Sequence, residues 1–177
     1  MKEIVSAVLD TYFKKMRAPT IEELSINNAH LLNEKWCCFV TLYLSGELRW
    51  SAGNVKEIHN SLAQELISNT MQALTEDKRF TPLTLDQTEN IQFQIDKISD
   101  RKMINLADIK NIDPVKNGII VIDREYEKLA VLLPNMSPKL LTGEDLIPVL
   151  TNKLKEKEMS DAKHIFYSIE TITESNY

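Results

Sequence analysis

The sequence has little of what most recognisable active sites are built from. It contains 177 residues, of which 4 are glycine, 2 are cysteine and 3 are histidine. Neither the glycine pattern of dinucleotide-binding turns nor that of phosphate-binding loops occurs. His30, His59 and His164 are far apart in the sequence and show no metal-ligand spacing. We therefore expect no metal site and no bound cofactor.

The two cysteines, Cys37 and Cys38, are adjacent, which argues against a structural disulfide. Neighbouring side chains of a strand point to opposite faces, so these thiols are poorly placed to bridge each other. Free thiols are typical of a reducing compartment. The chain has no apolar run of about 20 residues that would cross a bilayer, and its first residues lack the apolar core of a signal peptide. These features predict a cytoplasmic protein without a membrane partner.

A basic surface is missing as well. The formal net charge is -5 and the sequence pI is about 5.3, with no stripe of lysine and arginine interleaved with aromatic residues. Nucleic-acid binding relies on such a positive surface, so we expect no nucleic-acid partner. An apolar fraction of 43% and a charged fraction of 27% are ordinary for a globular chain, and the length suits one domain over residues 1–177.

Hydrophobic periodicity and turn residues predict a chain in which hairpins outnumber strand–helix–strand units. Helices are expected at residues 2–16, from Asn54 to about residue 74 and at 142–158, and strands at 37–44, 48–50, 91–96, 118–122, 128–133 and 163–173. Residues 99–114 are expected to be mostly loop. Pro148 favours a later onset of the last helix, because proline disrupts a helix interior.

This order of elements predicts an α+β fold with a mainly antiparallel sheet flanked by helices. Residues 36–98 and residues 118–173 each follow the order hairpin, helix, strand. The shared order predicts two related halves within the single domain.

The turn that follows the second strand is the first candidate for a functional site. Asn54 and Glu57 form a capping-box-like pair that would start a helix directly after Gly53. Free N–H groups at a helix start attract anions, and the alternative is a plain strand-to-helix turn. Arg49 would either orient a carboxylate or phosphate there or form an internal salt bridge. Ser51 is the candidate nucleophile.

Aromatic residues flank this turn. Trp50 is either a core residue or an exposed anchor for a protein partner. Arg79 and Phe80 follow the predicted helix, and they are interpreted first as a helix exit with Phe80 packed into the core. The candidate binding residues are Arg49, Trp50, Ser51, Gly53, Asn54, Arg79 and Phe80.

Several short blocks, spread over nearly the whole chain, resemble the AMMECR-like family. The matching blocks are Phe39-Val40-Thr41-Leu42, Gly46-Glu47-Leu48-Arg49 with Gly53, Asp77-Lys78-Arg79-Phe80-Thr81-Pro82-Leu83-Thr84, residues 91–99, Asn117-Gly118-Ile119-Ile120 and Leu132-Leu133-Pro134. The resemblance implies an α+β fold with a barrel-like, mainly antiparallel sheet built from two related halves. In bacteria and archaea the family occurs as protein A of a system that also contains a Memo-like protein and a radical-SAM protein. These two are therefore the expected protein partners.

The chain departs from the family at its signature. Leu-Arg-Gly-Cys-Ile-Gly in the family reads Leu48-Arg49-Trp50-Ser51-Ala52-Gly53 here. Because Ser51 replaces the cysteine, thiolate chemistry does not transfer to this chain. We expect a non-catalytic protein-interaction or accessory module. The alternative is an enzyme, a hydrolase or transferase, that acts on an anionic small molecule at the turn from Arg49 to Gly53, with Arg49 and Ser51 as its catalytic residues.

Overall fold

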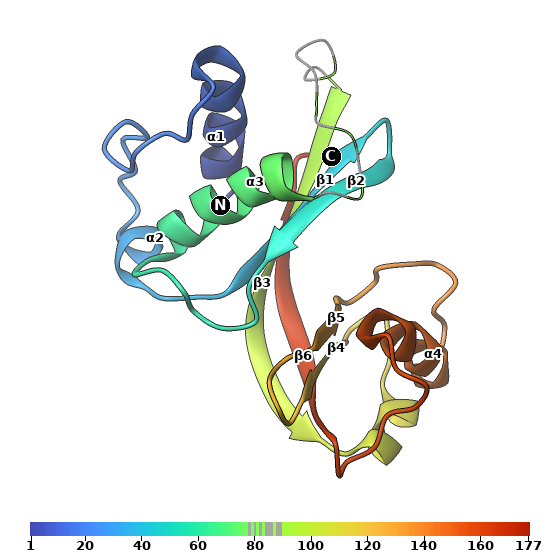
Figure 1. Ribbon diagram of the computed structural model, residues 1–177. Coiled ribbons are helices and arrows are strands. Elements are labelled where there is room, and N and C mark those ends of the chain that lie inside the picture. The colour runs from blue at the N-terminus through green and yellow to red at the C-terminus, as the bar shows by residue number, and fades with distance from the viewer. Residues whose placement is uncertain (78, 80, 82, 84–86, 88–89) are drawn as a thin grey trace. The chain divides into compact units, whose positions relative to one another are not determined.

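The structure is a computed structural model in which residues 1–77, 79, 81, 83, 87 and 90–177 are described (Figure 1). Its elements are α1 (Lys2–Lys15), α2 (Ala29–Asn33), β1 (Cys38–Leu44), β2 (Glu47–Gly53), α3 (Leu62–Glu76), β3 (Ile91–Ile104), the 3-10 helix η2 (Leu106–Asn111), β4 (Gly118–Asp123), β5 (Leu129–Leu132), α4 (Gly143–Leu154) and β6 (His164–Ser175). None of the helices in the described part combines the length and apolarity that crossing a membrane requires.

The six strands form one sheet in the order β2-β1-β3-β6-β4-β5. Pairing is antiparallel between β1 and β2, β1 and β3, β4 and β5, and β4 and β6. Helices accompany this sheet, so the predicted α+β class with a mainly antiparallel sheet is confirmed. Strand β2 is one edge of the sheet, and its position matters for the candidate site.

Contacts within the chain define two compact units. One unit comprises Met1–Lys97 with Ile172–Tyr177, and the other comprises Ile98–Thr171. The division falls within β3 and within β6, so each of these long strands contributes residues to both units. The predicted halves at residues 36–98 and 118–173 have different bounds, and their relatedness stays a prediction.

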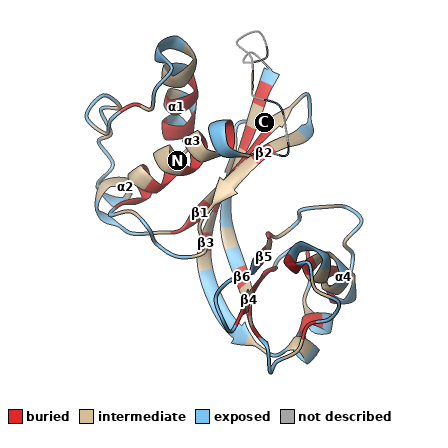
Figure 2. Cartoon of the chain, in the orientation of Figure 1, coloured by how far each residue is buried: buried red, intermediate tan, exposed pale blue. Residues whose placement is uncertain are grey.

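The core of the first unit lies under α3, which contacts α1 and the hairpin of β1 and β2. Apolar residues at helical spacing, among them Leu62, Leu66 and Ala73, form the buried stripe of α3. Strand β1 supplies Val40 and Leu42 to the same core. Figure 2 shows the resulting mixture of buried and more exposed positions along α1 and α3.

The core of the second unit is covered by α4, which contacts β5 and η2. The helix starts at Gly143 because Thr142 and Asp145 form a reciprocal capping box. A side chain at Gly143 would collide with the carbonyl of Ile109, so the helix start is also fixed by close packing. Pro148 lies inside α4, and the expectation that it delays the helix onset is wrong.

Two further sequence expectations need correction. The helix after Gly53 begins at Leu62, where Ser61 accepts a hydrogen bond from the Gln64 backbone N–H as the N-cap. Residues 54–61 are therefore a connection and not the first turns of a helix. Strand β3 continues to Ile104, so the first part of the predicted 99–114 loop is extended strand. That part is mostly exposed, which removed the hydrophobic alternation on which the strand prediction relied.

Candidate functional site

Arg49 occupies a β-bulge in the edge strand β2. The register pairs made by Leu48 and Trp50 with β1 leave Arg49 between them without an opposite residue. Bulges redirect a side chain and are enriched near functional sites. Arg49 Nη2 donates to Glu47 Oε2 at 3.0 Å, and the Arg49 side chain is 40% exposed. Its Nε is buried and has no acceptor among the described residues. This guanidinium therefore retains unused donor capacity.

Trp50 is a core residue. It is 3% exposed, faces Leu42 of β1 and belongs to the apolar cluster of the first unit. The alternative of an exposed aromatic anchor at this position is wrong, because the indole is buried in the core. A residue larger than the family's glycine is accommodated here on the core side of the strand.

Ser51 points to the other side of the hairpin and makes two hydrogen bonds, one through its side chain and one through its backbone. Its Oγ lies 3.0 Å from Oγ1 of Thr41, the residue directly opposite on β1. Its backbone N–H donates to Asp77 Oδ2 at 3.0 Å. Because Asp77 follows α3, the C-terminal end of α3 lies beside Ser51, and the N-terminal end starts from Ser61. The alternative of an anion-attracting helix start next to Ser51 is therefore wrong, because no helix starts there.

Asp77 connects the two sequence blocks that carry the resemblance. Its carboxylate accepts from Arg79 Nε at 2.8 Å and from Arg79 Nη2 at 2.6 Å, in addition to the Ser51 amide. The Asp77 side chain is 6% exposed, whereas that of Arg79 is mostly exposed. Hydrogen bonds from the Arg79 side chain, and then from the Ser51 N–H, lower the pKa of Asp77. Phe80, also predicted as a site residue, lies outside the described residues.

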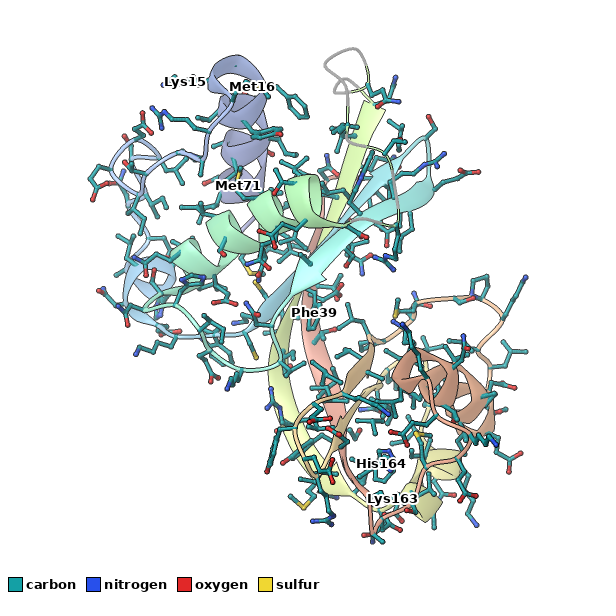
Figure 3. The ribbon with its side chains drawn as sticks, viewed as in Figure 1. Lys15, Met16, Phe39, Met71, Lys163 and His164 are labelled. Carbon is teal, nitrogen blue, oxygen red and sulfur yellow. The ribbon has the colours of Figure 1, made fainter. Side chains whose placement is uncertain are left out.

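Gly53 ends β2 in a crowded position. A side chain there would collide with the ring of Phe39, labelled in Figure 3, and with the carbonyl of Cys38. The glycine is thus required by close packing against β1. It makes no contribution to a helix start.

Asn54 belongs to a second, buried polar group. It is not a helix N-cap, and its Nδ2 donates to Glu65 Oε1 at 2.5 Å and to Asn69 Oδ1 at 3.2 Å. Glu65 and Asn69 are fully buried on α3. The other Glu65 oxygen accepts from the His59 backbone N–H at 3.2 Å. The group holds residues 54–61 against α3.

Cys38 borders the same group. Asn69 Nδ2 donates to the Cys38 carbonyl at 2.9 Å and lies 3.5 Å from Cys38 Sγ. Burial raises the pKa of the Cys38 thiol to about 12, despite the hydrogen bond from Asn69. A thiol in this state is not a nucleophile at neutral pH.

Sequence reasoning missed Glu65 and Asn69, although a signal was present. With Leu62, Leu66 and Ala73 they fall on one helical stripe, so helical periodicity could have indicated that these two polar residues face the core. Of the predicted residues, Ser51 and Arg79 meet at Asp77, and Gly53 and Asn54 lie at the buried group. Within the described residues, no cluster of three or more His, Cys, Asp or Glu residues suits a metal ion.

The fold and this edge-strand site define an α+β domain whose two characteristic blocks meet at one aspartate. The family model for AMMECR1 matches residues 3–170. The chain belongs to the AMMECR1 family. A solved structure, that of the uncharacterised protein PH0010 from Pyrococcus horikoshii, has a TM-score of 0.78 at 19% identity, covering 97% of this chain and 87% of that one.

Sequence relatives include a Thermotoga maritima protein that is 35% identical over 99 residues, 55% of each chain. Protein CA_C1420 of Clostridium acetobutylicum is 32% identical over 98 residues, which are 55% of this chain and 20% of that protein. Protein Mbar_A1807 of Methanosarcina barkeri is 25% identical over 140 residues, 77% of this chain and 68% of that protein. The alignments thus span one-fifth of the Clostridium protein and about half of the Thermotoga protein.

Proposed function

We propose that this AMMECR1-family domain is a non-catalytic interaction module that binds an acidic group of a protein partner at Arg49. The observation that carries the proposal is the bulge, which presents a partly exposed guanidinium with a buried Nε and no acceptor for it among the described residues. Buried donors are nearly always paired in native structures, so this one calls for an explanation.

A carboxylate of the partner would supply the missing acceptor. The guanidinium already donates to Glu47, but the Glu47 side chain is highly exposed and the pair is easily exchanged. A small rotation of the Arg49 side chain would offer the edge that contains Nε and one Nη to an incoming carboxylate in a bidentate arrangement. The Memo-like protein and the radical-SAM protein are the partners to test first.

The surroundings of Ser51 favour binding over catalysis. Its hydroxyl pairs with the Thr41 hydroxyl, which cannot act as a general base. The end of α3 that lies beside Ser51 is the C-terminal one, whose partial charge is negative. Such an environment opposes the negative charge that develops during acyl or phosphoryl transfer.

Calorimetric titration of the full chain with the Memo-like protein of the same organism, and separately with the radical-SAM protein, tests this proposal. We expect Arg49→Gln to weaken binding by roughly tenfold or more and Arg49→Lys by less, because lysine keeps the charge but not the bidentate geometry. Arg17→Gln is the matched control, since Arg17 is also partly exposed and paired with a glutamate, Glu23. Hexaglutamate serves as a probe of acidic recognition that needs no partner.

Equal binding by the Arg49→Gln and Arg17→Gln variants to all three probes would overturn the proposal. The enzyme alternative makes a different prediction. Turnover of a phosphate or carboxylate ester would establish a hydrolase in place of a binding module if Ser51→Ala abolishes it. Thr41→Val, which removes the hydroxyl partner of Ser51, is the control and should leave the fold intact.

A further inference from the structure

A groove along the solvent side of α3 lies apart from the edge-strand site and within the same compact unit. Its volume is about 740 Å³, and three segments line it: residues 18–22, residues 58–60 and α3. None of Arg49, Ser51, Asp77 or Arg79 contributes to the described lining. The groove therefore stands independently of the function proposed above.

The floor of the groove is apolar. Ile67 and Met71 of α3 and Ile21 are partly buried and present the rest of their surface to the groove. Figure 3 labels Met71 on this helix. Ile58, which also lines the groove, is 54% exposed and adds to its apolar surface. A flexible methionine beside branched aliphatic residues suits an apolar partner surface.

The charged residues of the groove carry one sign. Glu22 and Glu76 are both exposed, and the described lining contains no lysine or arginine. Among the cations close in sequence to the lining, Lys15 and Arg17 pair with Glu23, Lys14 pairs with Asp10 and Arg79 pairs with Asp77, and Lys56 is not part of the described lining. The groove thus combines an apolar floor with uncompensated carboxylates, which complements a ligand that is apolar on one side and basic at its margins.

The dimensions select the shape of that ligand. From Gln64 to Glu76 the groove follows α3 for about 18 Å, the length of roughly three helical turns. We infer that the groove binds a basic amphipathic helix of a partner protein. Apolar residues at positions i, i+3 or i+4, and i+7 of that helix would contact Ile58, Ile67 and Met71. Its lysine or arginine residues would pair with Glu22 and Glu76.

Fluorescence anisotropy with the full chain tests this inference. The probe is a labelled synthetic peptide of about 14 residues with leucines at helical spacing and lysines on both flanks of the leucine stripe. Two further peptides serve as comparisons, one scrambled to destroy the stripe and one with glutamate in place of lysine. We expect the basic amphipathic peptide to bind at least roughly tenfold more tightly than either comparison, and its affinity to fall as salt is added.

Variants locate the binding. Glu76→Lys and Ile58→Ser change exposed side chains, and each is expected to weaken the peptide by roughly fivefold or more. Glu125→Lys makes the same charge change outside the groove, and Met103→Ser replaces another exposed apolar side chain by serine outside the groove. Both should leave the affinity unchanged. If Ile58→Ser lowers the helical circular dichroism, this variant has lost structure, and the effect of Glu76→Lys on peptide affinity alone tests the location of the binding.

Three results would overturn the inference. The first is equal affinity for the basic and scrambled peptides, and the second is unchanged affinity in both groove variants. The third is dimerisation of the wild-type chain in analytical ultracentrifugation that Glu76→Lys abolishes, which would assign the groove to a second copy of this chain.

Discussion

The two compact units fix a carboxylate group in different ways. In the first unit Glu65 is fully buried and accepts only from neutral donors among its described contacts, which are two side-chain amides and a backbone N–H. In the second unit Glu156 is 20% exposed and pairs with a cation, with Lys128 Nζ 2.9 Å from Oε1 and His164 Nε2 3.1 Å from Oε2.

The difference follows from what each environment can solvate. A carboxylate without solvent contact needs several fixed N–H donors, and a buried cation beside it would add its own desolvation cost. Near the surface, water already solvates part of the carboxylate, so the exposed Lys128 and one buried imidazole, that of His164, suffice as partners. The fixed arrangement in the first unit explains how residues 54–61 are held without secondary structure, and the paired arrangement in the second should respond to salt and pH.

Glu65→Leu gives the largest effect expected from this comparison. The substitution removes the Glu65 acceptor from the Asn54 amide, which keeps only its bond to Asn69, and leaves the His59 N–H without an acceptor in a dry interior. We expect a loss of about 3 kcal/mol in the free energy of unfolding. Urea denaturation at neutral pH measures it. Glu65→Gln, which keeps one acceptor oxygen, should lose less.

Glu76→Leu is the control on the same helix. Glu76 is exposed, so its substitution should change the free energy of unfolding by no more than about 0.5 kcal/mol. Equal losses in Glu65→Leu and Glu76→Leu would show that the buried hydrogen bonds contribute nothing beyond helix propensity.

The α+β class, the hairpins and the family were predictable because they depend on local alternation, turn residues and short blocks. The start of α3 was not, because two capping patterns compete. Asn54 with Glu57 and Ser61 with Gln64 both fit the pattern, and only the second forms, with Gln64 also accepting from the Asn60 N–H. Contacts of Asn54 with Glu65 decide between them, and these contacts are tertiary.

The arrangement of the candidate residues could not be predicted from the sequence. In the sequence, Ser51 and Arg79 are separated by a helix whose start was not known. Their connection through hydrogen bonds to Asp77 depends on where α3 ends. The bulge at Arg49 is a register shift that alternation alone does not specify. Residues whose roles depend on register and on packing between elements are those that sequence reasoning misassigned.

Asp77→Asn tests what determines whether a carboxylate is bound by neutral donors or by a cation: the exposure of the carboxylate, or the compact unit to which it belongs. Asp77 belongs to the first unit, yet it combines an arginine with a backbone N–H. We expect a loss of about 1 kcal/mol at pH 7, from weaker hydrogen bonds to Arg79 and Ser51. The pKa of Asp77 is lowered, so this stabilisation is present above the ordinary aspartate pKa and is lost as pH falls through the lowered value.

The measurement is the difference in urea stability between wild type and Asp77→Asn at pH 7 and at a series of lower pH values. The difference should shrink as the pH falls through the lowered pKa of Asp77, because the wild-type carboxylate is protonated there. Asp10→Asn, which removes an exposed aspartate that pairs with Lys14, should show a smaller difference at pH 7. A difference for Asp77→Asn that is independent of pH would mean that geometry and not charge holds the two family blocks together.

Glu156→Gln should give the smallest effect and the clearest dependence on salt. The hydrogen bond from Lys128 is the main cause that lowers the pKa of Glu156, so its stabilisation is lost as pH falls through that lowered value. The Lys128 side chain is 45% exposed, and added salt screens the pair. We therefore expect a small drop in the thermal midpoint at low ionic strength that disappears at about 0.5 M salt.

The loss in Glu65→Leu should persist under the same conditions, because its hydrogen bonds are shielded from ions. If salt leaves the Glu156→Gln effect unchanged, the contrast between a solvated ion pair and a buried hydrogen-bonded carboxylate does not hold for this protein.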